Sequence, residues 1–155
     1  MRRFFFCRHG KIWDKDTLSN DGVRGLELTK SRLLERGFKA TDAWSSTQKQ
    51  CVLTANLLAP GVEVRATEAL HSFGNVRTLL AHADEFLAPL FAADVPKFAN
   101  ILAVSHDCMP AVMAWRMVKR NGGIPKWKLG ELNLLEMGAG LLVEETECLY
   151  IPPQK

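Results

Sequence analysis

The sequence lacks the features of a membrane protein and of a secreted, disulfide-bonded one. No apolar stretch approaches the roughly 20 residues that a transmembrane helix needs. The apolar run that follows Met1-Arg2-Arg3 ends at Arg8, which is too early for a signal peptide. The four cysteines, at positions 7, 51, 108 and 148, show no C-x-x-C spacing. We therefore expect a cytoplasmic protein whose cysteines are reduced.

The sequence also lacks a metal-binding cluster, a block of positive charge and a phosphate-binding loop. No His/Cys cluster resembles a zinc site, so neither a metal nor another cofactor is predicted. The 20 basic and 17 acidic residues are scattered and the formal net charge is only +3, so nothing indicates nucleic acid or a membrane surface as a partner. The glycines at 122–123 and 138–140 lack the strand–helix context of a phosphate loop.

What is present is an ordinary globular composition in a chain of 155 residues, which is enough for one domain with a substantial core. Strand-like and helix-like stretches alternate. Strands are predicted at residues 3–7, 41–45, 62–64, 101–104, 132–137 and 141–151, and helices at 19–36, 48–58, 76–91 and 110–120. This order predicts a single three-layer α/β/α domain over residues 1–155, with a mostly parallel central sheet. It does not indicate the oligomeric state.

Two of the four histidines follow the two most convincing buried strands. The apolar run at residues 4–7 ends at Arg8 and His9, and the run at residues 101–104 is followed closely by His106. Ligands of α/β sheets bind beyond the carboxyl ends of the strands. If the two strands are neighbours, both imidazoles and Arg8 face one crevice, with His9 as a candidate nucleophile and Arg8 as a candidate anion ligand. A structure with the histidines far apart would make the pattern accidental.

With these residues in place, the sequence resembles the histidine phosphatase superfamily, whose fold is phosphoglycerate mutase-like. Four segments resemble the family's motifs in order: Phe6-Cys7-Arg8-His9-Gly10, Leu18-Ser19-Asn20-Asp21-Gly22, Trp44-Ser45-Ser46 with Thr54-Ala55, and Val104-Ser105-His106. The short chain, without a large insertion before His106, is similar to the small phosphohistidine-phosphatase branch.

The resemblance implies a phosphatase that acts on phosphohistidine, on a small phosphorylated metabolite or on a phosphoprotein, without a cofactor. His9 would attack phosphorus and form a phosphohistidine intermediate, which water then hydrolyses. Arg8 and His106 would bind the phosphoryl oxygens. His9 must keep one ring nitrogen unprotonated, so we expect a backbone carbonyl or a similar acceptor to hold the other nitrogen.

The sequence departs from the family pattern at the second arginine. Gln50 stands at that position, and Thr47 replaces the proline of the motif. We expect Gln50 to contact substrate, but glutamine donates hydrogen bonds without a charge. The loss of one charge-assisted hydrogen bond, ~1.5–3 kcal/mol, would slow phosphoryl transfer roughly ten- to a hundredfold. An alternative function therefore stays open, namely a catalytically impaired module that binds a phosphorylated ligand or protein without turnover.

The proton donor for the leaving group also stays open. Glu68 lies where larger members of the family place this acid, and His71 is a nearby second candidate. Asp14 and Asp16, on the loop after His9, are further candidates. A phosphoramidate or an anhydride has a good leaving group and needs such an acid little, whereas a sugar phosphate or serine phosphate needs it more. The identity of the acid therefore bears on the class of substrate.

Overall fold

The structure is a computed structural model that describes residues 2–71, 74–91, 96, 98–129 and 135–153. The central sheet contains β1 (Arg3–Arg8), β4 (Asp42–Ser45), β5 (Val64–Ala66), β6 (Asn100–Ser105), β7 (Gly140–Glu144) and β8 (Glu147–Ile151). The helices are α1 (Asn20–Glu35), α2 (Lys49–Leu58), α3 (Val76–Leu90), α4 (Met109–Arg120) and the short 3-10 helix η1 (Glu68–Leu70). A separate hairpin pairs β2 (Ile12–Asp14) with β3 (Thr17–Leu18).

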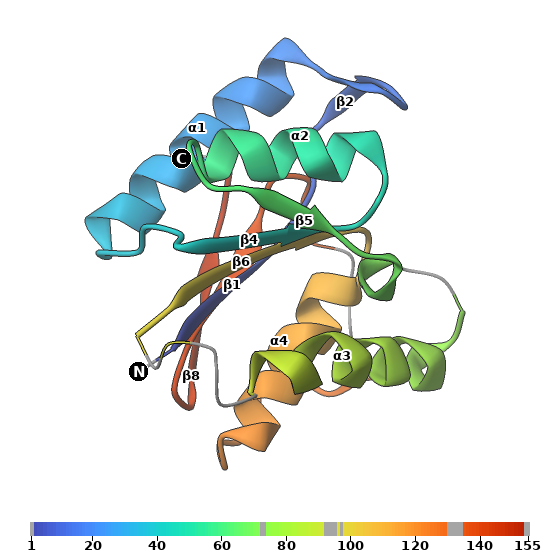
Figure 1. Ribbon diagram of the computed structural model, residues 1–155, viewed down its shortest axis with the longest axis vertical. Coiled ribbons are helices and arrows are strands. Elements are labelled where there is room, and N and C mark those ends of the chain that lie inside the picture. The colour runs from blue at the N-terminus through green and yellow to red at the C-terminus, as the bar shows by residue number, and fades with distance from the viewer. Residues whose placement is uncertain (1, 72–73, 92–95, 97, 130–134, 154–155) are drawn as a thin grey trace.

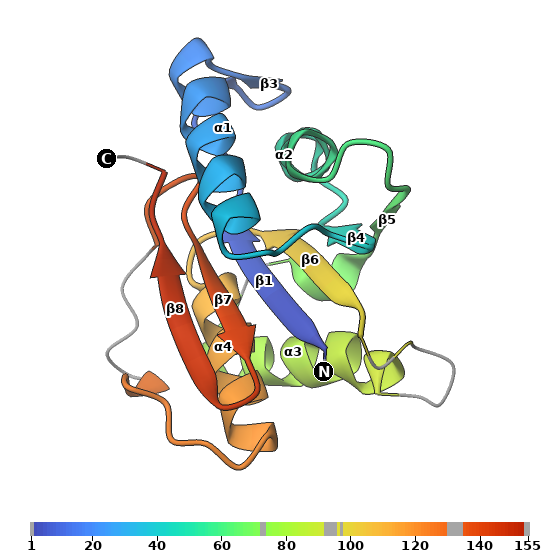
Figure 2. The same cartoon turned by 90° about the vertical axis from the view of Figure 1, so that its left-hand side faces the viewer.

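The sheet has the strand order β5-β4-β6-β1-β7-β8. The first four strands run parallel to one another, and β7 and β8 continue the sheet antiparallel. Helices α1 and α2 cover one face of the sheet, and α3 and α4 cover the other (Figures 1 and 2). This arrangement confirms the predicted α/β class with a mostly parallel sheet between two helical layers.

The central position of β1 follows from its continuous apolar run. Phe4 and Phe6 pack into the core on the α3/α4 face, whereas Phe5 and Cys7 pack into the core on the α1/α2 face. Strand β6 alternates between the two cores in the same way. Both faces of these strands are covered, which explains why the sequence shows no alternation of polar and apolar residues there.

Helix α1 begins against the loop that follows β1. Ser19 caps the helix, because its hydroxyl accepts a hydrogen bond from Gly22 N at 2.9 Å and donates one to the Lys11 carbonyl at 3.2 Å. A Cβ atom on Gly22 would lie only 2.1 Å from that same carbonyl oxygen. Gly22 therefore allows the first turn of α1 to touch the backbone of the β1 loop.

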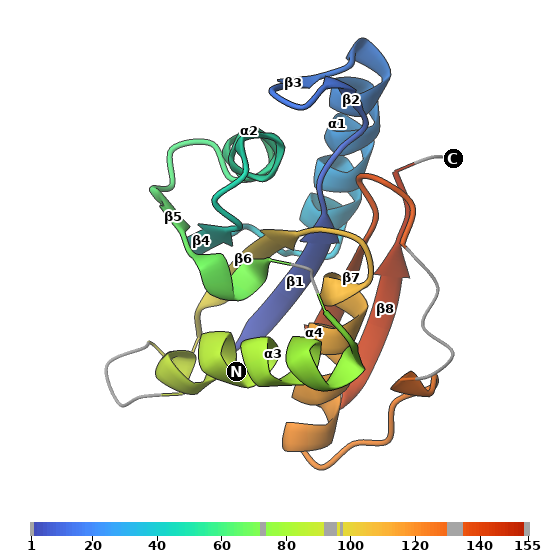
Figure 3. The ribbon, with the colours of Figure 1, turned by 90° about the vertical axis from the view of Figure 1, so that its right-hand side faces the viewer.

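The end of the chain differs from the prediction. The strand predicted at 132–137 lies in part outside the described residues, and positions 135–137 are not a strand. The stretch 141–151 is two strands rather than one, because the backbone reverses at Glu145, which has a left-handed φ of 52°. The hairpin of β2 and β3, beyond the end of β1 in Figure 3, and the short helix η1 had no counterpart in the sequence prediction.

Within the described part of the chain, no helix combines the length and the apolar character needed to cross a membrane.

Candidate active site

The carboxyl ends of three neighbouring parallel strands, β4, β6 and β1, meet at one edge of the sheet (Figure 1). Backbone hydrogen bonds continue one step past the strand ends. His9 N donates to the Ser105 carbonyl at 3.1 Å, and Ser46 N donates to the Val104 carbonyl at 2.9 Å. The residues that follow the three strands are therefore held side by side.

The structure brings His9 and His106 together at this edge. Their ring centroids are 5.5 Å apart, and the rings meet edge to face at 65°. Both side chains are largely buried, with 6% and 8% of their surface exposed. Two imidazoles from positions 97 residues apart thus lie against each other, as the pairing of β1 with β6 requires.

The tautomer of His9 follows from its contacts. Its Nδ1 lies 2.8 Å from the Gly10 carbonyl oxygen, an acceptor, so Nδ1 carries the proton and Nε2 is free of one in the neutral ring. Burial lowers the pKa of His9, the Gly10 carbonyl raises it, and the Arg8 cation lowers it further. Gly10 N in turn donates to the Thr54 hydroxyl at 3.0 Å, which fixes the turn against α2.

His106 rests on the segment between β4 and α2. Its Nε2 lies 2.8 Å from the Ser46 hydroxyl and 3.4 Å from the Cys51 sulfur. Burial, and then the proximity of His9, lower the pKa of His106 to about 4. Both histidines of the pair are therefore neutral at pH 7.

Arg8 is the cation beside the pair. Its Nη1 donates to the Leu135 carbonyl at 2.6 Å, and its Nη2 lies 3.5 Å from Asp107 Oδ1. Its Nε is buried and has no hydrogen-bond partner among the described residues. A buried guanidinium donor without a partner is costly, and an anion that enters the site would satisfy it.

Gln50 is buried in the first turn of α2. Its Nε2 donates to Gln48 Oε1 at 2.7 Å. Among the described residues, no hydrogen bond joins its side chain to Arg8 or to either histidine of the pair. The neutral residue at this position thus leaves Arg8 without a second guanidinium from α2.

The four candidate proton donors differ in position. His71 lies against the pair, with its ring 6.2 Å from that of His106 and its Nε2 2.6 Å from the Thr47 hydroxyl. Glu68 is exposed on η1, and its side chain forms no hydrogen bond or ion pair with any described residue. Asp14 and Asp16 are exposed on the β2–β3 hairpin, where Asp14 Oδ1 accepts from Asp16 N at 2.8 Å.

Three further residues contact the site residues although the sequence analysis assigned them no role: Ser46, Cys51 and Asp107. Ser46 directly follows β4, and Asp107 directly follows His106 at the end of β6. Their positions after strand ends could have indicated from the sequence that they lie at the site. Cys51 carried no such signal, because its contact with His106 depends on how α2 is turned against β6. In the described part of the chain, no group of three or more potential ligands could hold a metal ion.

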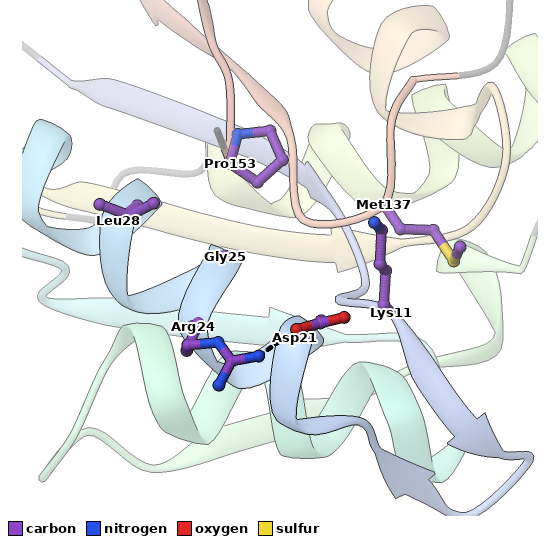
Figure 4. Close-up of a pocket in the computed structure, with 8 residues that line it drawn as sticks. Lys11, Asp21, Arg24, Gly25, Leu28, Met137 and Pro153 are labelled. Atoms are coloured by element: carbon purple, nitrogen blue, oxygen red, sulfur yellow. Dashed lines mark hydrogen bonds and ion pairs between the residues drawn. The ribbon is translucent and has the colours of Figure 1, made fainter. Parts of the chain in front are cut away.

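A pocket of about 300 Å³ lies between the loop after His9, helix α1 and the segments that flank β7 and β8. Figure 4 shows the side chains of Lys11, Asp21 and Arg24 around it, together with those of Met137 and Pro153. Arg24 pairs with Asp21 within the pocket. None of the predicted site residues lines this pocket, so it is separate from the histidine pair.

No family model matches the sequence, and no curated protein matches it significantly. Solved structures do match. A mutant phosphoserine phosphatase from Entamoeba histolytica in complex with phosphoserine has a TM-score of 0.69 at 12% identity, covering 99% of this chain and 98% of its own. A mycobacterial glucosyl-3-phosphoglycerate phosphatase with VO3 has a TM-score of 0.69 at 16% identity, covering 97% and 96%.

The protein histidine phosphatase SixA, complexed with tungstate, has a TM-score of 0.66 at 14% identity, covering 97% of both chains. These matches extend over nearly the whole chain, and identities this low establish the fold. They confirm the resemblance drawn from the sequence motifs at that level. The chain has the phosphoglycerate mutase-like fold of the histidine phosphatase superfamily.

Proposed function

We propose that the protein is a phosphatase that removes a phosphoryl group from a small metabolite or a protein, phosphohistidine included, through His9. The observation that carries the proposal is the state of His9. Its Nδ1 is engaged by the Gly10 carbonyl, and its Nε2 is free of a proton beside Arg8 and His106. The matched structures support it, because they are phosphatases with phosphoserine, VO3 or tungstate bound.

In the proposed reaction the Nε2 lone pair of His9 attacks phosphorus. The bond from phosphorus to the leaving oxygen or nitrogen breaks, and the leaving group takes up a proton. Water then attacks the phosphohistidine, the P–N bond breaks, inorganic phosphate leaves and His9 returns to its neutral form. Phosphoryl transfer needs mainly positioning and charge stabilisation, which fits a site built on strand ends.

Arg8 and His106 stabilise the phosphoryl oxygens in this proposal. The unpartnered Nε of Arg8 gives one buried donor for an oxygen. His106, with a pKa of about 4, donates as a neutral ring at pH 7. A bound phosphoryl group raises the pKa of His106 through its negative charge, which strengthens that hydrogen bond.

We place His71 ahead of Glu68 as the donor of the leaving-group proton. The His71 ring lies 6.2 Å from that of His106, whereas Glu68 is exposed on η1. Histidine is the side chain that most often serves as a general acid in enzymes. A clear preference of the enzyme for phosphohistidine over sugar phosphates would mean that the leaving group needs little help from either residue.

The proposal is tested by measuring phosphate release. The compounds are phosphohistidine, an activated aryl phosphate and several sugar phosphates. We expect release by the wild type and only background release by His9→Ala, because the nucleophile is gone. His82→Ala, which removes a histidine on α3 instead, is the matched control and keeps turnover. Circular dichroism melts of all three proteins verify that they are folded.

Full activity in His9→Ala would exclude this mechanism. If the folded wild type binds phosphate analogues but releases phosphate from none of the compounds, the protein is instead a phosphate-binding module. Binding is measured by calorimetry in parallel with turnover, so the two functions are separated in one set of experiments.

A further inference from the structure

Asp107 places a carboxylate next to Arg8, the cation whose charge acts on both His9 and His106. Its Oδ1 lies 3.5 Å from Arg8 Nη2, while the Leu135 carbonyl accepts from Nη1. The Arg8 side chain is 16% exposed and that of Asp107 is 50% exposed. A phosphoryl group that reaches Arg8 therefore meets a carboxylate already paired with the guanidinium.

The charges of Arg8 and Asp107 cancel each other. Arg8 is positive and Asp107 is negative, and position 50 holds a neutral glutamine. The pKa values of His9 and His106 are both lowered by burial, so the pair adds no charge at pH 7. A phosphate dianion would bring two negative charges to Arg8, whose guanidinium is already paired with a carboxylate.

The backbone holds Asp107 in an uncommon conformation. Its φ is 48°, in the left-handed region that few residues other than glycine adopt. Aspartate and asparagine tolerate this region better than most side chains. The position directly after His106 therefore carries a carboxylate on a backbone turn at the strand end, within reach of whatever Arg8 binds.

We propose that Asp107 selects phosphoryl compounds that carry a positive charge close to phosphorus, such as aminoalkyl phosphates. The inference rests on the proposed function, because it concerns the same site. A ligand ammonium group pairs with the Asp107 carboxylate while the phosphoryl oxygens pair with Arg8, so both charges of the protein are matched. A phosphate ester with a neutral substituent leaves Asp107 facing the phosphoryl oxygens, and this repulsion weakens its binding.

The test compares phosphoethanolamine with its N-acetyl derivative, which has the same phosphate but no ammonium charge. Binding is measured by calorimetry at pH 7 in a His9→Ala background, so that turnover cannot interfere. We expect the ammonium compound to bind roughly tenfold more tightly. In Asp107→Asn the preference falls to about one, and inorganic phosphate binds severalfold more tightly, because the repelling charge is gone.

Asparagine is the appropriate replacement because it also tolerates the left-handed conformation. Glu85→Gln, an exposed position on α3, removes the same charge away from the pair and should keep the preference. An unchanged preference in Asp107→Asn, or no binding of any phosphate compound to either protein, overturns the inference. Failure of the proposed function is detected in a separate experiment. In that case the wild type releases no more phosphate than His9→Ala does.

Discussion

At the scale of single residues, the described part of the site has one guanidinium, where the sequence pattern that the chain resembles has two. Arg8 follows β1, and Gln50 occupies the position on α2 that would supply the other. The amide of Gln50 bonds to Gln48, so the side chain stays within the start of α2. Charge at the proposed phosphoryl site therefore depends on Arg8 and on the carboxylate beside it.

Replacing Gln50 with arginine should increase turnover. A charged donor on α2 adds transition-state stabilisation, and we expect kcat/KM for an aryl phosphate to rise roughly ten- to a hundredfold in Gln50→Arg. Steady-state kinetics on purified protein measures this. Asn56→Arg, exposed further along the same helix, adds the same charge as a control. No gain in Gln50→Arg would mean that the pocket binds the phosphoryl group without a donor from this position.

The sequence was sufficient to place His9 and His106 but not to identify what surrounds them. Both histidines follow continuous apolar runs, and such runs mark central strands whose ends meet. The contact of Asp107 with Arg8 depends on one left-handed φ angle and on a side-chain direction, neither of which a residue pattern specifies. The choice between Glu68 and His71 likewise depends on how η1 turns after β5.

At the scale of elements, the position of α1 depends on one close backbone contact. The first turn of the helix lies against the Lys11 carbonyl, two residues after His9, and only a glycine at position 22 leaves room for it. The start of α1 and the loop after β1 are thus packed as a unit. A change at this contact alters both the helix and the loop that carries His9, the proposed nucleophile.

Gly22→Ala should destabilise the protein even though alanine favours helices. The added methyl group would overlap the Lys11 carbonyl, so the helix or the loop must shift, at a cost of about 1–3 kcal/mol in unfolding free energy. Urea denaturation followed by circular dichroism measures the loss. Ser31→Ala, exposed on the same helix, should change stability little. Equal stabilities of the two variants would show that the contact is not tight in solution.

The elements that the sequence predicted are those with a clear apolar pattern or with residues that mark where an element begins or ends. The helix from Ser19 and the buried strands β1 and β6 were anticipated because capping residues and apolar runs mark them. The split of 141–151 into β7 and β8 was missed, because Glu145 and Thr146 lack the glycine that usually signals a tight turn. The hairpin of β2 and β3 was missed because its strands are short and exposed.

At the scale of the whole molecule, two buried neutral histidines make stability depend on pH. The folded protein holds the pKa of His106 at about 4, below its usual 6.5, and that of His9 is lowered as well. As pH falls below 6.5, the unfolded chain binds these protons before the folded protein does. The stabilisation is therefore complete above pH 6.5 and is lost as pH falls toward 4.

We expect His106→Gln to flatten this dependence. The wild type should lose roughly 2–3 kcal/mol more unfolding free energy between pH 7 and pH 4 than the variant does, because the variant has no ring to protonate at this position. Urea denaturation at a series of pH values measures both slopes. Identical slopes would show that His106 is not held neutral by its surroundings.

The place of β1 between β6 and β7 has a consequence for the newly made chain. Arg3 pairs with Asn100 in β6 and with Glu144 in β7, so the first strand has no partner in the sheet until residue 100 has been synthesised. At 5–20 residues per second the interval is about 5–20 s. During this interval the three consecutive phenylalanines at positions 4–6 have no partner strand. We expect a chaperone that binds apolar segments to bind them while the chain is still on the ribosome.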